Sequence, residues 1–221
     1  YRGETNTLVT ILIDTSASMQ YKSHEVSKLD YAKYAASAIA YLANQQRDGI
    51  GLIVFDDDVR HYVPPSGRQG QMHRILHGIE HAQVGVRTDF GRPFEHCMEF
   101  LKRRGLVVVL SDFYAVPDAI IKAVAPLSSR GNEVALFHVM DPQEIAPKFD
   151  ESSILIDMET QEAKEISPDY TRREYVDKVK AHIAELKEKV LGARMDYFLM
   201  DTSRPLDETL REYLAIRVGR L

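Results

Sequence analysis

The stretch LVTILIDTSASM ends an apolar run with a carboxylate and then alternates small residues with hydroxyl side chains. Its three strongest oxygen donors are Asp14, Ser16 and Ser18, which are separated by Thr15 and Ala17. Along an extended loop, alternate side chains project to the same side, so the three donors can converge while the intervening residues face away. The spacing therefore predicts a cluster of oxygen ligands at the mouth of a strand.

Two more oxygen donors stand beside later segments of the chain. Thr88 lies in the loop GVRTDFG, just before a predicted helix, and Asp112 follows the strongly β-like run LVVVLS. Oxygen ligands without histidine or thiolate select Mg²⁺, Ca²⁺ or Mn²⁺ over Zn²⁺ or Cu²⁺. Because these ligands are small and mostly neutral and leave room for water, we expect Mg²⁺ as the cofactor, with Mn²⁺ and Ca²⁺ as alternatives.

The elements that must position these side chains alternate between strands and helices, which is typical of a parallel sheet covered by helices on both faces. The run Val59–Val63 differs, because Pro64 and Pro65 end it, and it is predicted as an antiparallel edge strand. The other predicted strands are 8–14, 49–55, 106–110, 133–140 and 196–200, and the predicted helices are 29–46, 70–81, 90–104, 117–128, 170–191 and 206–216. The stretch 142–168 is predicted as an irregular excursion that contains a short hairpin of 154–158 and 163–166.

We therefore predict an α/β fold: a doubly wound, mostly parallel six-stranded sheet with one antiparallel edge strand, in a single domain over residues 1–221. If the first and fourth strands lie side by side, their connections leave in opposite directions and open a crevice at their carboxyl ends. Ligands bind at such a crevice in open α/β sheets. Asp14 and Asp112 follow these two strands, so we expect them to meet there.

Composition excludes several classes of function. The formal net charge is −5 and the basic residues are scattered, so we expect no nucleic-acid partner. No apolar run approaches the roughly 20 residues that span a bilayer, so this segment is expected to make no direct membrane contact. Cys97 is the only cysteine, which excludes an intrachain disulfide and fits the cytoplasm. Because the chain begins at Tyr1 rather than methionine, we expect an upstream segment, able to tether the domain to a membrane, outside this sequence.

The predicted oxygen ligands resemble the metal site of a known class of domains. DTSAS at 14–18, with Thr88 and Asp112, is similar to the metal-ion-dependent adhesion site of von Willebrand factor A domains at all five positions. Over nearly the whole chain, phrases such as ETNTLVTILIDTSASM, DGIGLIVFDDDVRHYVPP, RRGLVVVLSDF, EVALFHVMDPQE and DMETQEAKEI resemble a bacterial family of von Willebrand A-like proteins of unknown function. That family is often encoded beside MoxR-type AAA+ ATPases.

The resemblance implies a metal-dependent protein-interaction module. In it the hydroxyls would bind the ion directly, the aspartates would act largely through water or hydrogen bonds, and a partner's Asp or Glu would fill an open coordination position. The implied partners are a protein that presents such a carboxylate and an AAA+ ATPase of the MoxR type, acting together in protein assembly or activation.

Two other functions remain open from the residues. An Mg²⁺-dependent hydrolase or phosphotransferase could use Asp14, although DTSAS lacks the second aspartate of an aspartyl-phosphate phosphatase and the chain carries neither G-x-S-x-G nor a Walker A loop. We therefore expect no catalysis. A structural scaffold, in which the metal only joins three loops, is the third reading.

Other polar clusters have simpler structural interpretations. His73, His77 and His81 repeat at helical spacing and could hold zinc, but an exposed polar face is the better interpretation. The run 56–58 of three aspartates lacks the spacing of an EF-hand and predicts a solvated hairpin turn. His138 lies in a predicted buried strand and is expected in the core.

Overall fold

The central sheet is formed by strands that are apolar along most of their length. A computed structural model describes residues 7–85, 91–147, 153–156, 163–166 and 168–218 of the chain. Within them a six-stranded sheet has the order β3-β2-β1-β4-β5-β8, in which β3 alone is antiparallel to its neighbour. The strands are β1 (Leu8–Asp14), β2 (Gly49–Phe55), β3 (Val59–Ser66), β4 (Leu106–Ser111), β5 (Glu133–Met140) and β8 (Asp196–Asp201). The predicted fold class is confirmed.

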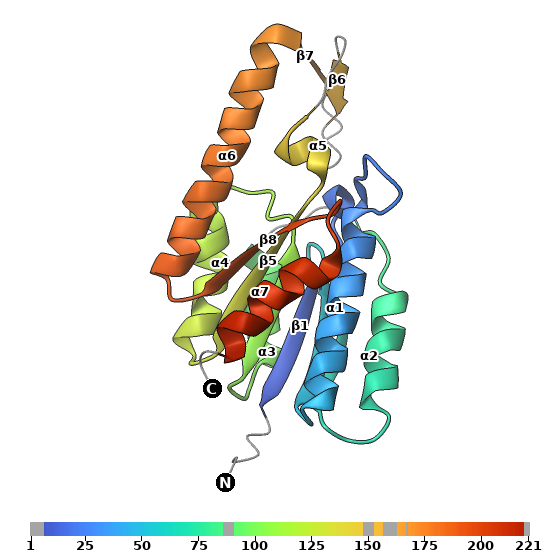
Figure 1. The fold of residues 1–221 in the computed structure, drawn as a ribbon. Coiled ribbons are helices and arrows are strands. Elements are labelled where there is room, and N and C mark those ends of the chain that lie inside the picture. Colours follow the sequence, from blue (N-terminus) through green and yellow to red (C-terminus); the bar gives the residue numbers. More distant parts are fainter. Residues whose placement is uncertain (1–6, 86–90, 148–152, 157–162, 167, 219–221) are drawn as a thin grey trace.

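Helices cover both faces of this sheet (Figure 1). One face packs against α1 (Lys28–Gln45), α2 (Gln71–Glu80) and α7 (Leu206–Val218). The other packs against α3 (Gly91–Phe100), α4 (Pro117–Ser129) and α6 (Pro168–Gly192). Along β1 the side chains alternate between the two layers, with Ile11 and Ile13 in the first and Leu12 in the second, so the strand is buried on both sides.

Most elements lie within two residues of their predicted bounds, and two, β3 and α3, differ by three residues or more. β3 continues through Pro64 and Pro65 to Ser66, which an edge strand tolerates because one side of its backbone needs no ladder partner. α3 ends at Phe100 instead of reaching Arg104, since the chain turns there toward β4. At that turn a Cβ on Gly105 would lie 2.2 Å from the Leu8 carbonyl oxygen, so only glycine fits the approach.

A short connection above the carboxyl ends of the strands was not predicted. Asp141 caps the helix α5 (Pro142–Ile145): its side chain accepts from the Gln143 amide, while Glu144 accepts from the Asp141 amide. The same carboxylate accepts from the Ser23 amide and hydroxyl, 2.8 and 2.5 Å away, which ties the loop before α1 to α5. The predicted hairpin follows as β6 (Ser153–Ile156) and β7 (Ala163–Ile166), which pair antiparallel.

No helix of the described residues combines the length and the apolar character that crossing a membrane requires.

Candidate metal centre

β1 and β4 deliver two carboxylates to one point at the carboxyl edge of the sheet. The strands are parallel neighbours, and Ile13 pairs with Leu110, so Asp14 and Asp112 emerge next to each other. Both are buried, with exposed fractions of 0% and 6%. The predicted meeting of these two side chains at the switch point is therefore what the structure shows.

The loop after β1 brings two hydroxyls together, although it is not the extended segment that the spacing suggested. Residues Ala17–Gln20 form a 3-10 turn, η1, with Ser16 as its N-cap. The Ser16 and Ser18 Oγ atoms lie 3.1 Å apart. Thr15 faces away, as predicted, and its hydroxyl donates to the Phe55 carbonyl of β2 at 3.0 Å. The two hydroxyls thus converge where Ser16, at φ −55° and ψ 162°, leads into the turn that carries Ser18.

Asp14 is held on both of its oxygens. Oδ1 accepts from the Ser16 amide at 2.8 Å, and Oδ2 accepts from the Ser111 hydroxyl at 2.6 Å. Burial, with the nearby Asp112 carboxylate as the second cause, raises the pKa of Asp14 to about 7 in the absence of a cation. The two hydrogen bonds therefore fix the orientation of the carboxylate, but its ionised form is disfavoured as long as no cation is bound.

Lys28 is a buried cation beside this pair. Its side chain is 1% exposed, and Nζ lies 2.8 Å from Asp112 Oδ2 and 2.6 Å from Glu144 Oε1. Burial alone would raise the pKa of Asp112, but the Lys28 ammonium and a hydrogen bond from Ser18 hold it below its usual range. Glu144 has a raised pKa because burial outweighs the same ammonium. Lys28 thus links Asp112 to α5.

The donor set and the charge of the region fit a divalent cation. Asp14 and Asp112 place two carboxylates close together in a buried region, where the charge of Asp112 disfavours ionisation of Asp14, and a divalent ion would offset this repulsion. Mg²⁺ ligands at 2.0–2.1 Å and right angles are separated by about 2.9 Å, close to the 3.1 Å between the serine hydroxyls. Asp14, Ser16, Ser18 and Asp112 would hold the ion; we call these four residues the candidate metal centre.

Thr88, the fifth predicted ligand, lies outside the described residues. The segment that leads to Thr88 is described as far as Gly85, whose amide donates to the Thr15 carbonyl at 2.7 Å. This bond fixes residues 84–85 against the loop that carries Ser16.

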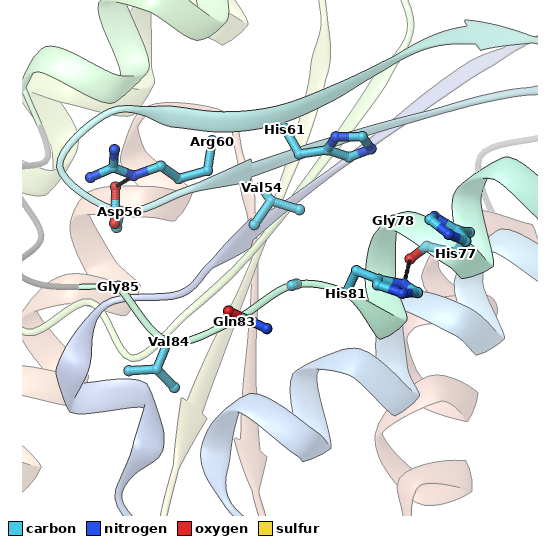
Figure 2. Close-up of a pocket in the computed structure, with 11 residues that line it drawn as sticks. Val54, Asp56, Arg60, His61, His77, Gly78, His81, Gln83, Val84 and Gly85 are labelled. Carbon is cyan, nitrogen blue, oxygen red and sulfur yellow. Dashed lines mark hydrogen bonds and ion pairs between the residues drawn. The ribbon is translucent and has the colours of Figure 1, made fainter.

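A second polar region lies at the edge of the sheet, between β3 and α2. A pocket of about 530 Å³ is lined there by Asp56, Arg60 and three histidines, His61, His77 and His81; we call it the histidine pocket (Figure 2). The imidazoles are exposed, and those of His77 and His81 stack with their centroids 4.0 Å apart. Across the described part of the chain, no three His, Cys, Asp or Glu side chains are arranged to hold a metal ion.

Most of the simpler interpretations of the remaining polar residues are confirmed. His73, His77 and His81 are exposed, and the aspartates 56–58 form the predicted turn between β2 and β3. That turn is not solvated throughout, because Asp56 is 1% exposed and pairs with Arg60 at 2.5 Å. His138 is 1% exposed and its Nδ1 lies 2.7 Å from the Tyr197 hydroxyl.

Sequence reasoning missed three residues at the candidate metal centre. Ser111 precedes Asp112 in LVVVLSD, and its position at the end of the predicted strand indicated that its hydroxyl would lie near the two aspartates. Glu144 belongs to the sequence DPQE, part of the resemblance to the bacterial family, and in the structure it forms a capping box with Asp141. Lys28 precedes the apolar stripe of α1 and gives no local sign that its ammonium is buried.

The chain is similar to proteins without an established activity. The family model "Protein of unknown function DUF58" matches residues 2–185. Uncharacterized proteins of Mycobacterium tuberculosis and Mycobacterium bovis are each 26% identical to it over 211 residues, which cover 94% of this chain and 66% of theirs. The chain therefore spans about two thirds of the length of these relatives.

Solved structures share its fold. The conserved hypothetical protein BatB from Bacteroides thetaiotaomicron has a TM-score of 0.61 at 15% identity, covering 96% of this chain and 97% of BatB. An aerotolerance-related membrane protein from Bacteroides fragilis has a TM-score of 0.62 at 18% identity, covering 92% and 96%.

Proposed function

The chain belongs to the DUF58 family of proteins of unknown function, and we propose that it is a divalent-metal-dependent protein-interaction module with a von Willebrand A-like adhesion site. One observation carries the proposal. Two buried carboxylates on neighbouring central strands meet a pair of hydroxyls at the spacing of an Mg²⁺ coordination edge. Beside them, Lys28 is ion-paired with Asp112 and with Glu144.

The chain's own side chains each have a part in this contact. Ser16 and Ser18 are the neutral ligands, while Asp14 keeps the Ser16 amide and the Ser111 hydroxyl in place. Asp112 shares its charge with Lys28, so less of that charge is available to a cation. When bound, Mg²⁺ would supply an electrophilic centre whose open position accepts an Asp or Glu carboxylate of a partner protein. Mn²⁺ and Ca²⁺ are the alternative ions.

The sequence resemblance supports the nature of the partner. The related bacterial genes stand beside MoxR-type AAA+ ATPases, so we propose that the module acts with such an ATPase in the assembly or activation of another protein. We place this contact in the cytoplasm, where the buried free thiol of Cys97 fits a reducing environment. A tether outside residues 1–221 is compatible with it.

Direct titration with Mg²⁺ is the first test. Calorimetry of the wild type should show one binding event, which Asp14→Asn should abolish, since the amide keeps the shape of the side chain and removes its charge. The matched control is Asp118→Asn, at a side chain that is 83% exposed and ion-paired with Lys189 on the surface. Equal Mg²⁺ binding by wild type and Asp14→Asn would contradict the proposed ligand set.

Capture from a cell lysate is the second test. Wild type in Mg²⁺, wild type in chelator and Asp14→Asn in Mg²⁺ should retain different proteins, with the acidic partner lost in the last two. If all three retain the same set, the metal-bridged contact is wrong. A scaffold role predicts an unchanged set together with a strongly lowered unfolding midpoint in chelator and in the variant.

The hydrolase alternative has no specific observation in its favour. Within the described residues neither Ser16 nor Ser18 is bonded to an imidazole, and His138 instead contacts Tyr197. Mg²⁺-dependent phosphate release that disappears in Asp14→Asn would establish catalysis in its place.

A further inference from the structure

An apolar pocket opens beside the candidate metal centre and shares a wall with it. Its volume is about 400 Å³, and Asp112 lines it together with side chains from the loop before α4, from β5, from α5 and from α6. In Figure 1 these elements gather where α5 and α6 meet the carboxyl edge of the sheet. We call this cavity the apolar pocket. A group bound at Asp112 would therefore stand against the lining of this pocket.

Large apolar side chains beside this pocket are exposed, whereas on most protein surfaces such side chains are buried or scattered singly. Tyr114 and Val116 are 68% and 69% exposed, and they follow Asp112 by two and four residues. Met140 and Val179 line the same cavity from β5 and α6. Contiguous apolar surface of this kind, next to a polar centre, is typical of a site that a partner covers.

Two of the polar side chains that line the pocket already have partners. Glu144 contacts Lys28 and the Asp141 amide, and His138 contacts Tyr197. An occupant gains little from these satisfied groups and gains most by burying its own apolar surface. At about 400 Å³ the space lies near the lower end of the usual range of ligand pockets and is large enough for one or two side chains.

We propose that the apolar pocket receives a large apolar side chain of the partner protein, phenylalanine- or leucine-like, that lies within a few residues of the carboxylate bound at the metal centre. The proposal rests on the proposed function and names the partner's recognition segment: an acidic residue with an aromatic or branched aliphatic neighbour. The exposed ammonium of Lys178, which also lines the pocket, favours a segment of negative charge. The metal centre would supply dependence on the ion, and the pocket would supply sequence specificity.

Selection from a phage library of random dodecapeptides tests this inference. The target proteins are the Mg²⁺-loaded wild type, the pocket variant Tyr114→Ala/Val116→Ser, and the control Leu191→Ser. Tyr114 and Val116 are exposed, so the pocket variant should fold, and serine is also a favourable N-cap at position 116. Leu191 is a half-exposed apolar side chain near the far end of α6, so its substitution should leave selection unchanged.

The expected wild-type consensus contains Asp or Glu and a large apolar residue, whereas the pocket variant should keep the acid and lose the apolar preference. Replacing the apolar residue of a selected peptide by alanine should weaken its binding to the wild type about 10- to 100-fold. The same replacement should change binding to the pocket variant less than about twofold.

Other outcomes separate this inference from the proposed function. A wild-type consensus with an acid alone, dependent on Mg²⁺, overturns the apolar pocket as a recognition site and leaves the metal-bridged contact standing. An apolar consensus without an acid, equal in chelator and Mg²⁺, overturns both, as does a selection that enriches no peptide.

Discussion

The candidate metal centre and the histidine pocket are both polar, and they differ in what surrounds them. At the metal centre, Asp14, Asp112 and Lys28 are almost fully buried and bonded to one another or to neighbouring strands. In the histidine pocket the imidazoles of His77 and His81 are exposed. They lie at the end of α2, which packs beside the edge strand β3. The larger cavity belongs to the second region.

Burial of charge, rather than the number of ligand-type side chains, is what separates the candidate metal centre from the histidines of the second region. Burying ionised groups is costly unless they are matched by opposite charge, so a fold retains such a group only where other interactions compensate. Exposed histidines carry no comparable cost and can occupy a solvated helix face without a ligand. The two regions should therefore respond very differently to substitution.

Removal of the buried ammonium should have the largest effect. Lys28→Met leaves Asp112 and Glu144 buried without their cation, and we expect the free energy of unfolding to fall by about 3–5 kcal/mol. Urea denaturation in chelator measures it, with Lys22→Met, at an exposed side chain, as the control. A loss below about 1 kcal/mol would mean that the pair is not buried as described.

The pH dependence of Asp14 should come next. Its folded pKa of about 7 lies above the unfolded value near 3.9, so between these values the folded state holds a proton that the unfolded state has lost. In chelator, the stability of wild type relative to Asp14→Asn should therefore fall as pH rises from about 4 to 7, by at most about 1.4 kcal/mol per pH unit. It should be constant outside this window.

Denaturation series of the two proteins at several pH values measure this difference. Saturating Mg²⁺ should oppose the fall most strongly at pH 7 and above, because metal binding requires the ionised carboxylate. A relative stability that rises with pH would show that Asp14 has a depressed pKa and would contradict the electrostatic account of the centre.

A smaller effect is expected at the residue that orients Asp14. Ser111→Ala removes the hydroxyl that donates to Asp14 Oδ2 and accepts from the Phe113 amide, and should cost about 1.5–3 kcal/mol. Ser129→Ala is the control, since that hydroxyl donates to the Ala125 carbonyl on an exposed turn. Equal losses in thermal or urea unfolding would remove Ser111 from the set that supports the centre.

The smallest effect is expected in the histidine pocket. The double variant His77→Ala/His81→Ala should unfold within about 0.5 kcal/mol of wild type, and one equivalent of Zn²⁺ should shift neither protein's melting temperature. His73→Ala on the same helix is the matched control. A Zn²⁺-dependent stabilisation that only the double variant loses would make these histidines a metal site and would reverse the contrast between the two regions.

The strands could be predicted well because the apolar runs that form them are visible within a few neighbouring residues. β1, β2 and β5 have the predicted bounds, since uninterrupted apolar and β-branched runs flanked by polar residues or glycine leave few alternatives. Asp14 and Asp112 could be placed together because the rules of strand order fix which ends adjoin.

The sequence did not indicate the contacts that cross the fold. Lys28 meets Asp112 and Glu144 over separations of 84 and 116 residues, and no local periodicity encodes such a pairing. The 3-10 turn that carries Ser18 also escaped prediction, because short polar segments satisfy several turn geometries equally well. Thr88 remains a prediction, since it lies outside the described residues.

The central position of β1 also sets an order of events during synthesis. Its partner β4 contributes Ser111, which lies 97 residues after Asp14. At about 5–20 residues per second, a ribosome needs roughly 5–20 s to extend the chain from one residue to the other. During that interval the edge of β1 that later pairs with β4 has no native neighbour, because β2 pairs with the opposite edge, and its unpaired backbone groups are open to misassociation.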